Sequence, residues 1–341
     1  MRFRIKLETA VLACMFLGSA TSALAQQKGQ WVPGQFGLNA GVIPDPGVTY
    51  ANLTVNYSAG RLNDANGNHI LQNVTGTYAF WANENILYCV PDHKFLGGYY
   101  APYIAVNVAN GSLVADIPGT NLSVNGGGAG LADMYFQPVN LGWHFGKRVD
   151  FNAGYAFFAP TGRYTPGASD NIGSGYWGNV QTSGTTYYIT KNHGTTANLM
   201  TAWEFNHGQR QVASIPAGRF ISTKTPGQAF TMEWGVGQAL PLKKDLSILA
   251  QLGVVGYDQW QVSSNGGTII VAGIPVPAST LPYYSVHSIG VQSNLVLPPK
   301  ALVFFFKYYD ECSAKARPQG RSFVFGGSWT FRNPKPPSAK P

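Results

Sequence analysis

The stretch RSFVFGGSWTF at residues 321–331 alternates with a period of two. One face carries aromatic side chains at four positions: Phe323, Phe325, Trp329 and Phe331. The opposite face carries Val324 and small or polar side chains. Aromatic residues at both ends of one face suit a strand whose rings lie at the two interfaces of a membrane. The stretch therefore predicts a lipid-facing strand that closes a transmembrane β-barrel.

The same alternation recurs at 197–206, 230–237 and 302–311. Four charged residues in these segments share the face opposite the apolar one: Glu204, Glu233, Lys307 and Glu311. A basic side chain that faces the middle of a bilayer costs roughly 2–4 kcal/mol. This partition predicts that the four charges point into the lumen of the barrel.

The composition agrees with a barrel. Charged residues make up 11% of the chain, against about 25% in an ordinary soluble domain, and aromatic residues make up 13%. No apolar run after residue 25 approaches the roughly 20 residues of a membrane-spanning helix. A transmembrane barrel needs neither a charged surface nor a long apolar run. A secreted soluble β-sandwich remains the alternative.

The two ends of the chain read as segments outside the barrel. Residues 1–25 have a basic start, an apolar stretch and the small-residue site Ala23-Leu24-Ala25, which predicts a signal peptide. Cleavage before Cys14, as in a lipoprotein, is the alternative. We expect residues 26–331 to form the barrel and 332–341, rich in Pro and Lys, to form a periplasmic tail.

The alternation and the turn residues predict an all-β, up-and-down antiparallel barrel of about twelve strands: 47–58, 72–82, 97–108, 131–145, 150–160, 176–190, 195–207, 228–240, 246–260, 284–297, 301–311 and 321–331. An even number of strands returns both ends of the chain to the periplasm. Short connections indicate periplasmic turns, although 83–96 does not read as one. Long connections rich in Gly, Pro, Ser and Asn predict outer loops: 59–71, 109–128, 160–175, 207–227, 261–283 and 312–320.

Several classes of function are disfavoured. The net charge is +8, but the basic residues are scattered, whereas nucleic-acid binding needs a concentrated basic face. The six histidines lack metal-site spacing and no cofactor motif is present, so we expect no metal and no cofactor. After removal of the signal peptide two cysteines remain, Cys89 and Cys312, which the predicted topology places near opposite rims and therefore unpaired.

The loop that begins at Pro160 contains three candidate site residues: Arg163, Tyr164 and Asp170. Its prolines and glycines would stiffen it, so it could fold into the barrel mouth and touch a solute. Alternatively, Arg163 pairs with Asp170 or with a lipopolysaccharide phosphate.

The lumen supplies the other candidates. The four inward charges, together with Asp133 and Arg317 near a rim, could form a charged track that selects solutes. Alternatively, they neutralise one another inside a plugged barrel. The many tyrosines near strand ends suit an interfacial girdle, and some could line an apolar path.

An enzymatic role has little support. His287 and Ser288 could suggest an outer-membrane lipid hydrolase, but neighbouring residues on a strand point to opposite faces.

Four stretches resemble a family of outer-membrane barrels linked to the meta-pathway of phenol degradation. They are GLADMYFQPVNLGWHFG (130–146), GYAFFAPTGRYTPGASDNIGSGYWG (154–178), FTMEWGVGQAL (230–240) and FFFKYYDECSAKARPQGRSFVFGGSWTF (304–331). The resemblance implies a porin-like, non-catalytic barrel that passes small hydrophobic or aromatic compounds.

The expected function is passive uptake of such compounds across the outer membrane. The expected partners are outer-membrane lipid, lipopolysaccharide, the solute and the barrel-assembly machinery, with no nucleic acid. The alternative from another class is a structural or surface-interaction barrel with a closed lumen.

Overall fold

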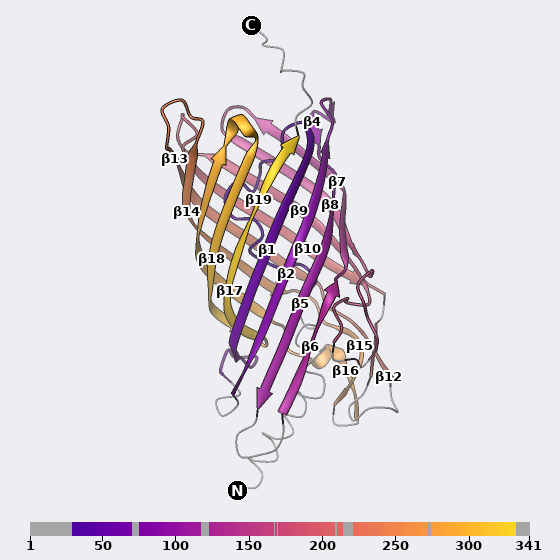
Figure 1. Cartoon of the computed structure of the whole chain (residues 1–341). Coiled ribbons are helices and arrows are strands. Elements are labelled where there is room, and N and C mark those ends of the chain that lie inside the picture. The colour runs from indigo at the N-terminus through magenta and orange to yellow at the C-terminus, as the bar shows by residue number, and fades with distance from the viewer. Residues whose placement is uncertain are drawn as a thin grey trace.

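The computed structural model describes residues 29–69, 75–116, 123–166, 168, 170–208, 210–213, 221–271 and 274–331. The predicted signal peptide and the predicted tail lie outside the described residues. Twelve antiparallel strands form a closed, tilted barrel, as the sequence predicts (Figure 1). The wall strands are β1 (Gly47–Leu62), β2 (Thr75–Val90), β5 (Tyr103–Asp116), β7 (Met134–Phe145), β8 (Val149–Ala159), β9 (Trp177–Tyr188), β10 (Thr195–His207), β13 (Ala229–Pro241), β14 (Leu249–Gln261), β17 (Ser285–Leu297), β18 (Leu302–Lys315) and β19 (Pro318–Phe331).

The barrel closes between its first and last wall strands. β1 pairs with β19 from Val48 opposite Phe331 to Leu62 opposite Pro318. The aromatic-rich end of the chain therefore lies beside the beginning of β1, on the rim drawn at the top of Figure 1. This rim also carries the short turns, which marks it as the periplasmic one.

One seam of the wall is interrupted. β5 pairs with β7 only between Tyr103–Ala105 and Tyr135–Gln137. Farther out β5 pairs instead with β6 (Ser123–Leu131), which has no second partner strand in the described part of the chain. Toward the periplasm β4 (Gly98–Tyr100), preceded by β3 (Lys94–Phe95), takes over the pairing with β7. Pro138 lies in this region of β7 and cannot donate a backbone hydrogen bond.

The outer loops partly differ from the prediction. The prediction of a long loop at 312–320 is wrong, because β18 and β19 are joined by only Ala316 and Arg317. A bulge opposite His287 and Ser288 shifts the register of β18 and hides the period-two pattern there. Four short strands form an additional sheet within two other loops: β11 (Arg210–Ala213), β12 (Ile221–Thr225), β15 (Gly266–Val271) and β16 (Ile274–Pro277).

Helical structure is minor. The described residues contain two short 3₁₀ helices, η1 (Ala278–Thr280) and η2 (Pro298–Lys300). No described helix is long and apolar enough to cross a bilayer. Cys89 and Cys312 are both free and exposed.

The predicted division between lipid and lumen is confirmed for the residues on which it was based. Phe325 is 46% exposed on the outside, whereas Glu204, Glu233, Lys307 and Glu311 are at most 4% exposed inside. An ion pair between Asp310 and Arg321 and a hydrogen bond between Asp258 and His287 do occur on the outer face. They lie toward the outer ends of their strands, where the interface is more polar than the hydrocarbon layer.

Candidate functional site

The lumen contains a stretch of the chain that precedes the first strand. Residues 29–46, GQWVPGQFGLNAGVIPDP, form this luminal segment, which contains no regular helix or strand. Gly34 and Gly37 have φ angles of +93° and +115°, which non-glycine residues rarely adopt. These glycines let the segment bend sharply inside the barrel. No role for this stretch could be predicted from its sequence, because it lacks period-two alternation.

The outer part of the segment is held by a buried carboxylate. Glu204 accepts hydrogen bonds from the backbone N–H groups of Gln30 at 2.8 Å and of Trp31 at 3.0 Å. The Trp31 ring stacks on Phe36 and meets the edge of Tyr135, with ring centroids 6.0 and 6.2 Å apart. The segment thus fills part of the lumen with an aromatic cluster.

The middle turn is held by a second carboxylate and an ammonium group. Glu233 accepts the backbone N–H of Phe36 at 2.7 Å and receives the Trp31 indole N–H at 3.4 Å. Lys307 donates to the carbonyl oxygens of Gly34, Gln35 and Phe36. Three of the charges predicted to face the lumen therefore bind backbone of the same chain.

Neutral side chains continue the attachment toward the periplasm. The side chain of Gln292 accepts the backbone N–H of Leu38 at 3.1 Å. In the same way, Asn198 accepts the N–H of Asn39 at 2.9 Å. Thr186 accepts the N–H of Gly41, also at 2.9 Å. All these acceptors come from the half of the wall that runs from β9 to β18. The luminal segment is consequently bound to one side of the barrel.

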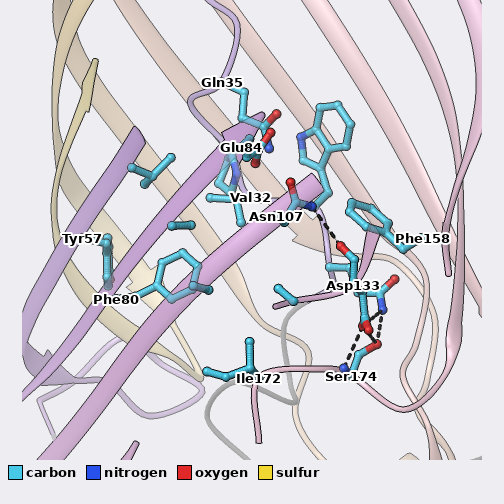
Figure 2. A pocket seen from close by; sticks show the side chains of 18 of the residues that line it. Val32, Gln35, Tyr57, Phe80, Glu84, Asn107, Asp133, Phe158, Ile172 and Ser174 are labelled. Atoms are coloured by element: carbon cyan, nitrogen blue, oxygen red, sulfur yellow. Dashed lines mark hydrogen bonds between the residues drawn. The ribbon is translucent and has the colours of Figure 1, made fainter. Parts of the chain in front are cut away.

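Two larger cavities lie in the lumen of the described part of the chain. The outer one measures about 240 Å³ and the inner one about 510 Å³. Both are lined by the same five residues, which form a waist where the cavities adjoin: Trp31, Gln35, Glu84, Asn107 and Phe158. Figure 2 shows the outer cavity, with Glu84 near Gln35 and Phe158 on the far side.

The wall opposite the attachment carries apolar side chains interspersed with hydroxyl and amide groups, among them Tyr57, Tyr88 and Asn107. β1, β2 and β5 present small or apolar side chains to the cavities: Val55, Phe80, Ala82, Ile86, Ala105 and Ala109. Glu84 is the ionisable exception at the waist, and it forms no hydrogen bond or ion pair within the described chain. Glu84 was not predicted as a candidate site residue, because the predicted strand ended at residue 82, whereas β2 continues to Val90.

Asp133 connects an outer loop to the luminal segment. Its carboxylate accepts the backbone N–H groups of Gly162 at 2.9 Å and Ser174 at 2.8 Å, and the side-chain amide of Gln30 at 3.0 Å. The Ser174 hydroxyl also donates to it, as Figure 2 shows. The loop at 160–176 is therefore fixed over the outer cavity, where Tyr164 contributes to the lining.

Arg163 and Asp170 form an ion pair with each other at the outer surface. Arg163 also donates to the backbone carbonyl of Asp170 at 2.8 Å. Hydrogen bonding from the guanidinium holds the pKa of Asp170 below its usual value. Both side chains are about half exposed, so the pair braces the loop from outside the cavity.

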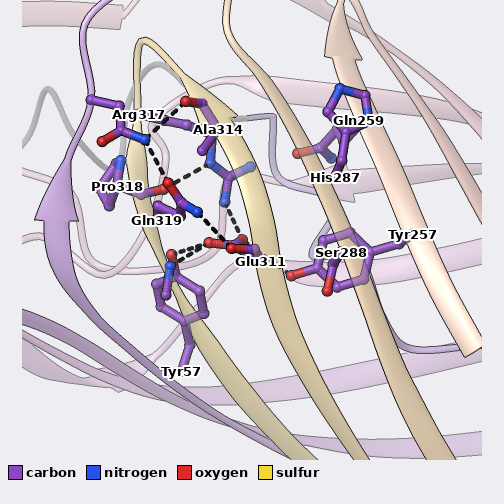
Figure 3. Close-up of polar contacts among 12 residues, drawn as sticks. Tyr57, Tyr257, Gln259, His287, Ser288, Glu311, Ala314, Arg317, Pro318 and Gln319 are labelled. Carbon is purple, nitrogen blue, oxygen red and sulfur yellow. Dashed lines mark hydrogen bonds and ion pairs between the residues drawn. The ribbon is translucent and has the colours of Figure 1, made fainter. Parts of the chain in front are cut away.

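A separate buried cluster surrounds Glu311. Its carboxylate accepts the hydroxyl groups of Tyr57 at 2.7 Å and Tyr257 at 3.1 Å, and pairs with Arg317 at 3.0 Å. It also accepts the backbone N–H of Gly320 at 2.7 Å. Figure 3 shows these groups converging from β1, β14 and the β18–β19 turn.

The candidate residues thus form separate groups instead of one continuous track. Glu204, Glu233 and Lys307 bind the luminal segment, while Glu311 and Arg317 pair near the outer rim. The described residues contain no group of three His, Cys, Asp or Glu side chains suited to a metal ion.

His287 and Ser288 are not brought together. The His287 ring bonds to Asp258 at 2.6 Å on the outer face, while the Ser288 hydroxyl is buried and donates to the Asp310 carbonyl at 3.0 Å. They contribute no nucleophile–base pair to each other.

The fold of this chain is similar to those of several solved outer-membrane barrels. An outer-membrane channel of Pseudomonas putida F1 superposes with a TM-score of 0.67 at 12% identity, covering 89% of this chain and 100% of the other. The β domain of a Bordetella autotransporter superposes with a TM-score of 0.50 at 11% identity, covering 84% of this chain and 100% of the other. The transport unit of an Escherichia coli autotransporter superposes with a TM-score of 0.50 at 12% identity, covering 93% of this chain and 99% of the other.

A comparison with curated proteins finds no match. A family named for the MetA-pathway of phenol degradation matches residues 59–325, which is most of the chain. With a closed barrel, an apolar exterior and this match, the chain is an outer-membrane β-barrel that belongs to the phenol MetA-pathway degradation family.

Proposed function

We propose that the protein is a passive, non-catalytic channel for small hydrophobic or aromatic compounds. The observation that carries the proposal is the pair of adjoining cavities beside the luminal segment. A solute would enter the outer cavity, pass the waist between Glu84 and Trp31, and leave through the inner cavity toward the periplasm.

The chemistry of the cavity wall supports an apolar solute. Val55, Phe80, Ala82 and Ala109 line the outer cavity, and Ile86 and Ala105 line the inner one. A dry apolar cavity of about 150 Å³ holds a benzene molecule. The outer cavity, at about 240 Å³, therefore suits one ring with a small substituent.

The family and the fold agree with this role without identifying the solute. The Pseudomonas putida protein is described as an outer-membrane channel, and the family is named for phenol degradation. Under the proposal, the apolar exterior contacts lipid, the outer rim contacts lipopolysaccharide, and the barrel-assembly machinery inserts the protein.

A closed barrel with a structural or surface-binding role is the second candidate. The specific observation in its favour is the luminal segment, which fills part of the lumen and is held by Glu204, Glu233 and Lys307. In that case the cavities would be internal spaces with no through passage.

Solute uptake separates the two candidates. Purified protein is inserted into liposomes with a lipopolysaccharide outer leaflet, and the entry of toluene and phenol is compared with that in protein-free liposomes. The channel predicts faster entry of at least one of them, together with a small single-channel conductance. Unchanged entry and electrical silence would support the closed barrel and reject transport.

A further inference from the structure

Glu84 occupies an unusual position for a carboxylate. It lines both cavities at the waist, on a wall formed by β1, β2 and β5 whose other lining side chains are all uncharged. The other luminal carboxylates, including Glu204, Glu233 and Glu311, are occupied by hydrogen bonds or ion pairs. Glu84 forms neither within the described chain, so its oxygens are available to a molecule in the passage.

An unused carboxylate in a confined space favours a hydrogen-bond donor. An ionised carboxylate is an acceptor only, and its hydrogen bonds contribute more than those between neutral groups. A solute that carries a hydroxyl group can donate to Glu84 while its ring remains against Phe158 and Trp31, which line the same waist.

The surroundings oppose charged solutes. Asp133 also lines the outer cavity, and the two cations of the cavity linings, Lys307 and Arg317, are already bound to backbone carbonyls and to Glu311. An anion at the waist would therefore meet the negative charge of Glu84 without a free positive charge to offset it. A cation would lose much of its hydration between apolar walls, which is costly. A neutral donor avoids both penalties.

Resting on the proposed channel function, we propose that Glu84 selects neutral, single-ring compounds that carry a hydroxyl group over compounds of the same size that lack a donor. The hydroxyl donates to the Glu84 carboxylate at the waist, and the ring lies in one of the two cavities. Glu84 is thus a specificity-determining residue of the passage.

The test measures binding of a matched pair of compounds to the full chain in detergent by equilibrium dialysis. The pair is p-cresol and 4-fluorotoluene, which share ring and size but differ in the donor. The variants are Glu84→Gln and Glu84→Leu, and the control is Asp310→Asn, which removes a carboxylate from the outer face. Protein-free detergent micelles give the background. Barrel folding is checked by heat modifiability on gels.

One hydrogen bond to a charged acceptor predicts about tenfold tighter binding of p-cresol than of 4-fluorotoluene to the unmodified protein. Glu84→Leu should abolish this preference and leave 4-fluorotoluene binding unchanged, while Asp310→Asn should retain it. Glu84→Gln should give a smaller preference, because its acceptor is neutral.

Equal binding of both compounds to the unmodified protein, or a preference that survives in Glu84→Leu, would show that Glu84 does not select the solute. Tighter binding of benzoate or benzylamine than of p-cresol would also overturn the inference. Each of these results leaves the channel itself intact. If neither ring compound binds above background, the channel function fails together with the inference.

Discussion

Glu233 and Lys307 hold the same residue of the luminal segment from two different strands. Glu233 on β13 accepts the N–H of Phe36 at 2.7 Å, and Lys307 on β18 donates to the carbonyl oxygen of Phe36. The two strands are separated in the wall by β14 and β17. The position of the segment is therefore set by opposite charges that reach it from different parts of the barrel.

Replacing Lys307 with Met should loosen the luminal segment. The change removes hydrogen bonds from a charged donor to Gly34, Gln35 and Phe36, and each such bond contributes about 1.5–3 kcal/mol. We expect larger and more variable single-channel currents, because the segment would leave its place against the wall more often.

Lys300→Met is the matched control, since Lys300 is exposed in the periplasmic turn at η2. Its currents should equal those of the unmodified protein. Identical currents in Lys307→Met would mean that the segment does not limit the passage.

Asp133→Asn should release the loop at 160–176. The carboxylate accepts hydrogen bonds from Gly162, Ser174 and Gln30, and an amide cannot accept all of them equally well. We expect severalfold faster proteolysis within this loop on intact cells, with an unchanged barrel on gels. Cleavage no faster than in the unmodified protein would argue against Asp133 as the connection.

The outer loop should also respond to acid. The pKa of Asp170 is lowered from 3.8 by hydrogen bonding from Arg163, so the pair stabilises the loop above that value. The contribution is lost as the pH falls through the lowered pKa in the folded protein.

Hydrogen exchange of the backbone at 162–165 should therefore show protection that is constant from pH 7 to pH 5 and declines below about pH 4, after correction for the intrinsic rate. In Asp170→Asn this decline should be absent. An acid-dependent decline of equal size in the variant would assign it to another group.

The sequence predicted the wall much better than the contents of the lumen. Alternation in β10, β13, β18 and β19 placed their lipid and lumen faces correctly, because the bilayer requires apolar side chains on one side of each strand. The register shift at His287 and Ser288 broke this rule locally, so the end of β18 was mistaken for a loop.

The hydrogen-bond partners of the luminal residues could not be predicted from the sequence, because they depend on the three-dimensional fold. Glu204 and Glu233 were recognised as inward-facing, but the backbone groups they bind belong to a distant stretch with no periodic pattern. Arg163 could have contacted a solute, Asp170 or a lipopolysaccharide phosphate, and in the structure it pairs with Asp170. The partners of Asp133 lie 29 to 103 residues away, which local spacing cannot reveal.

The passage beside the luminal segment is tested most directly by narrowing it from the opposite wall. Ala82 on β2 faces the outer cavity, whereas Ala79 lies on the opposite face of the same strand and points out of the barrel. Entry of toluene and phenol into lipopolysaccharide-coated liposomes is measured for Ala82→Trp and Ala79→Trp. The account predicts that Ala82→Trp reduces entry to the protein-free rate and that Ala79→Trp leaves it unchanged. Equal, undiminished entry through both variants would contradict a passage along β1, β2 and β5.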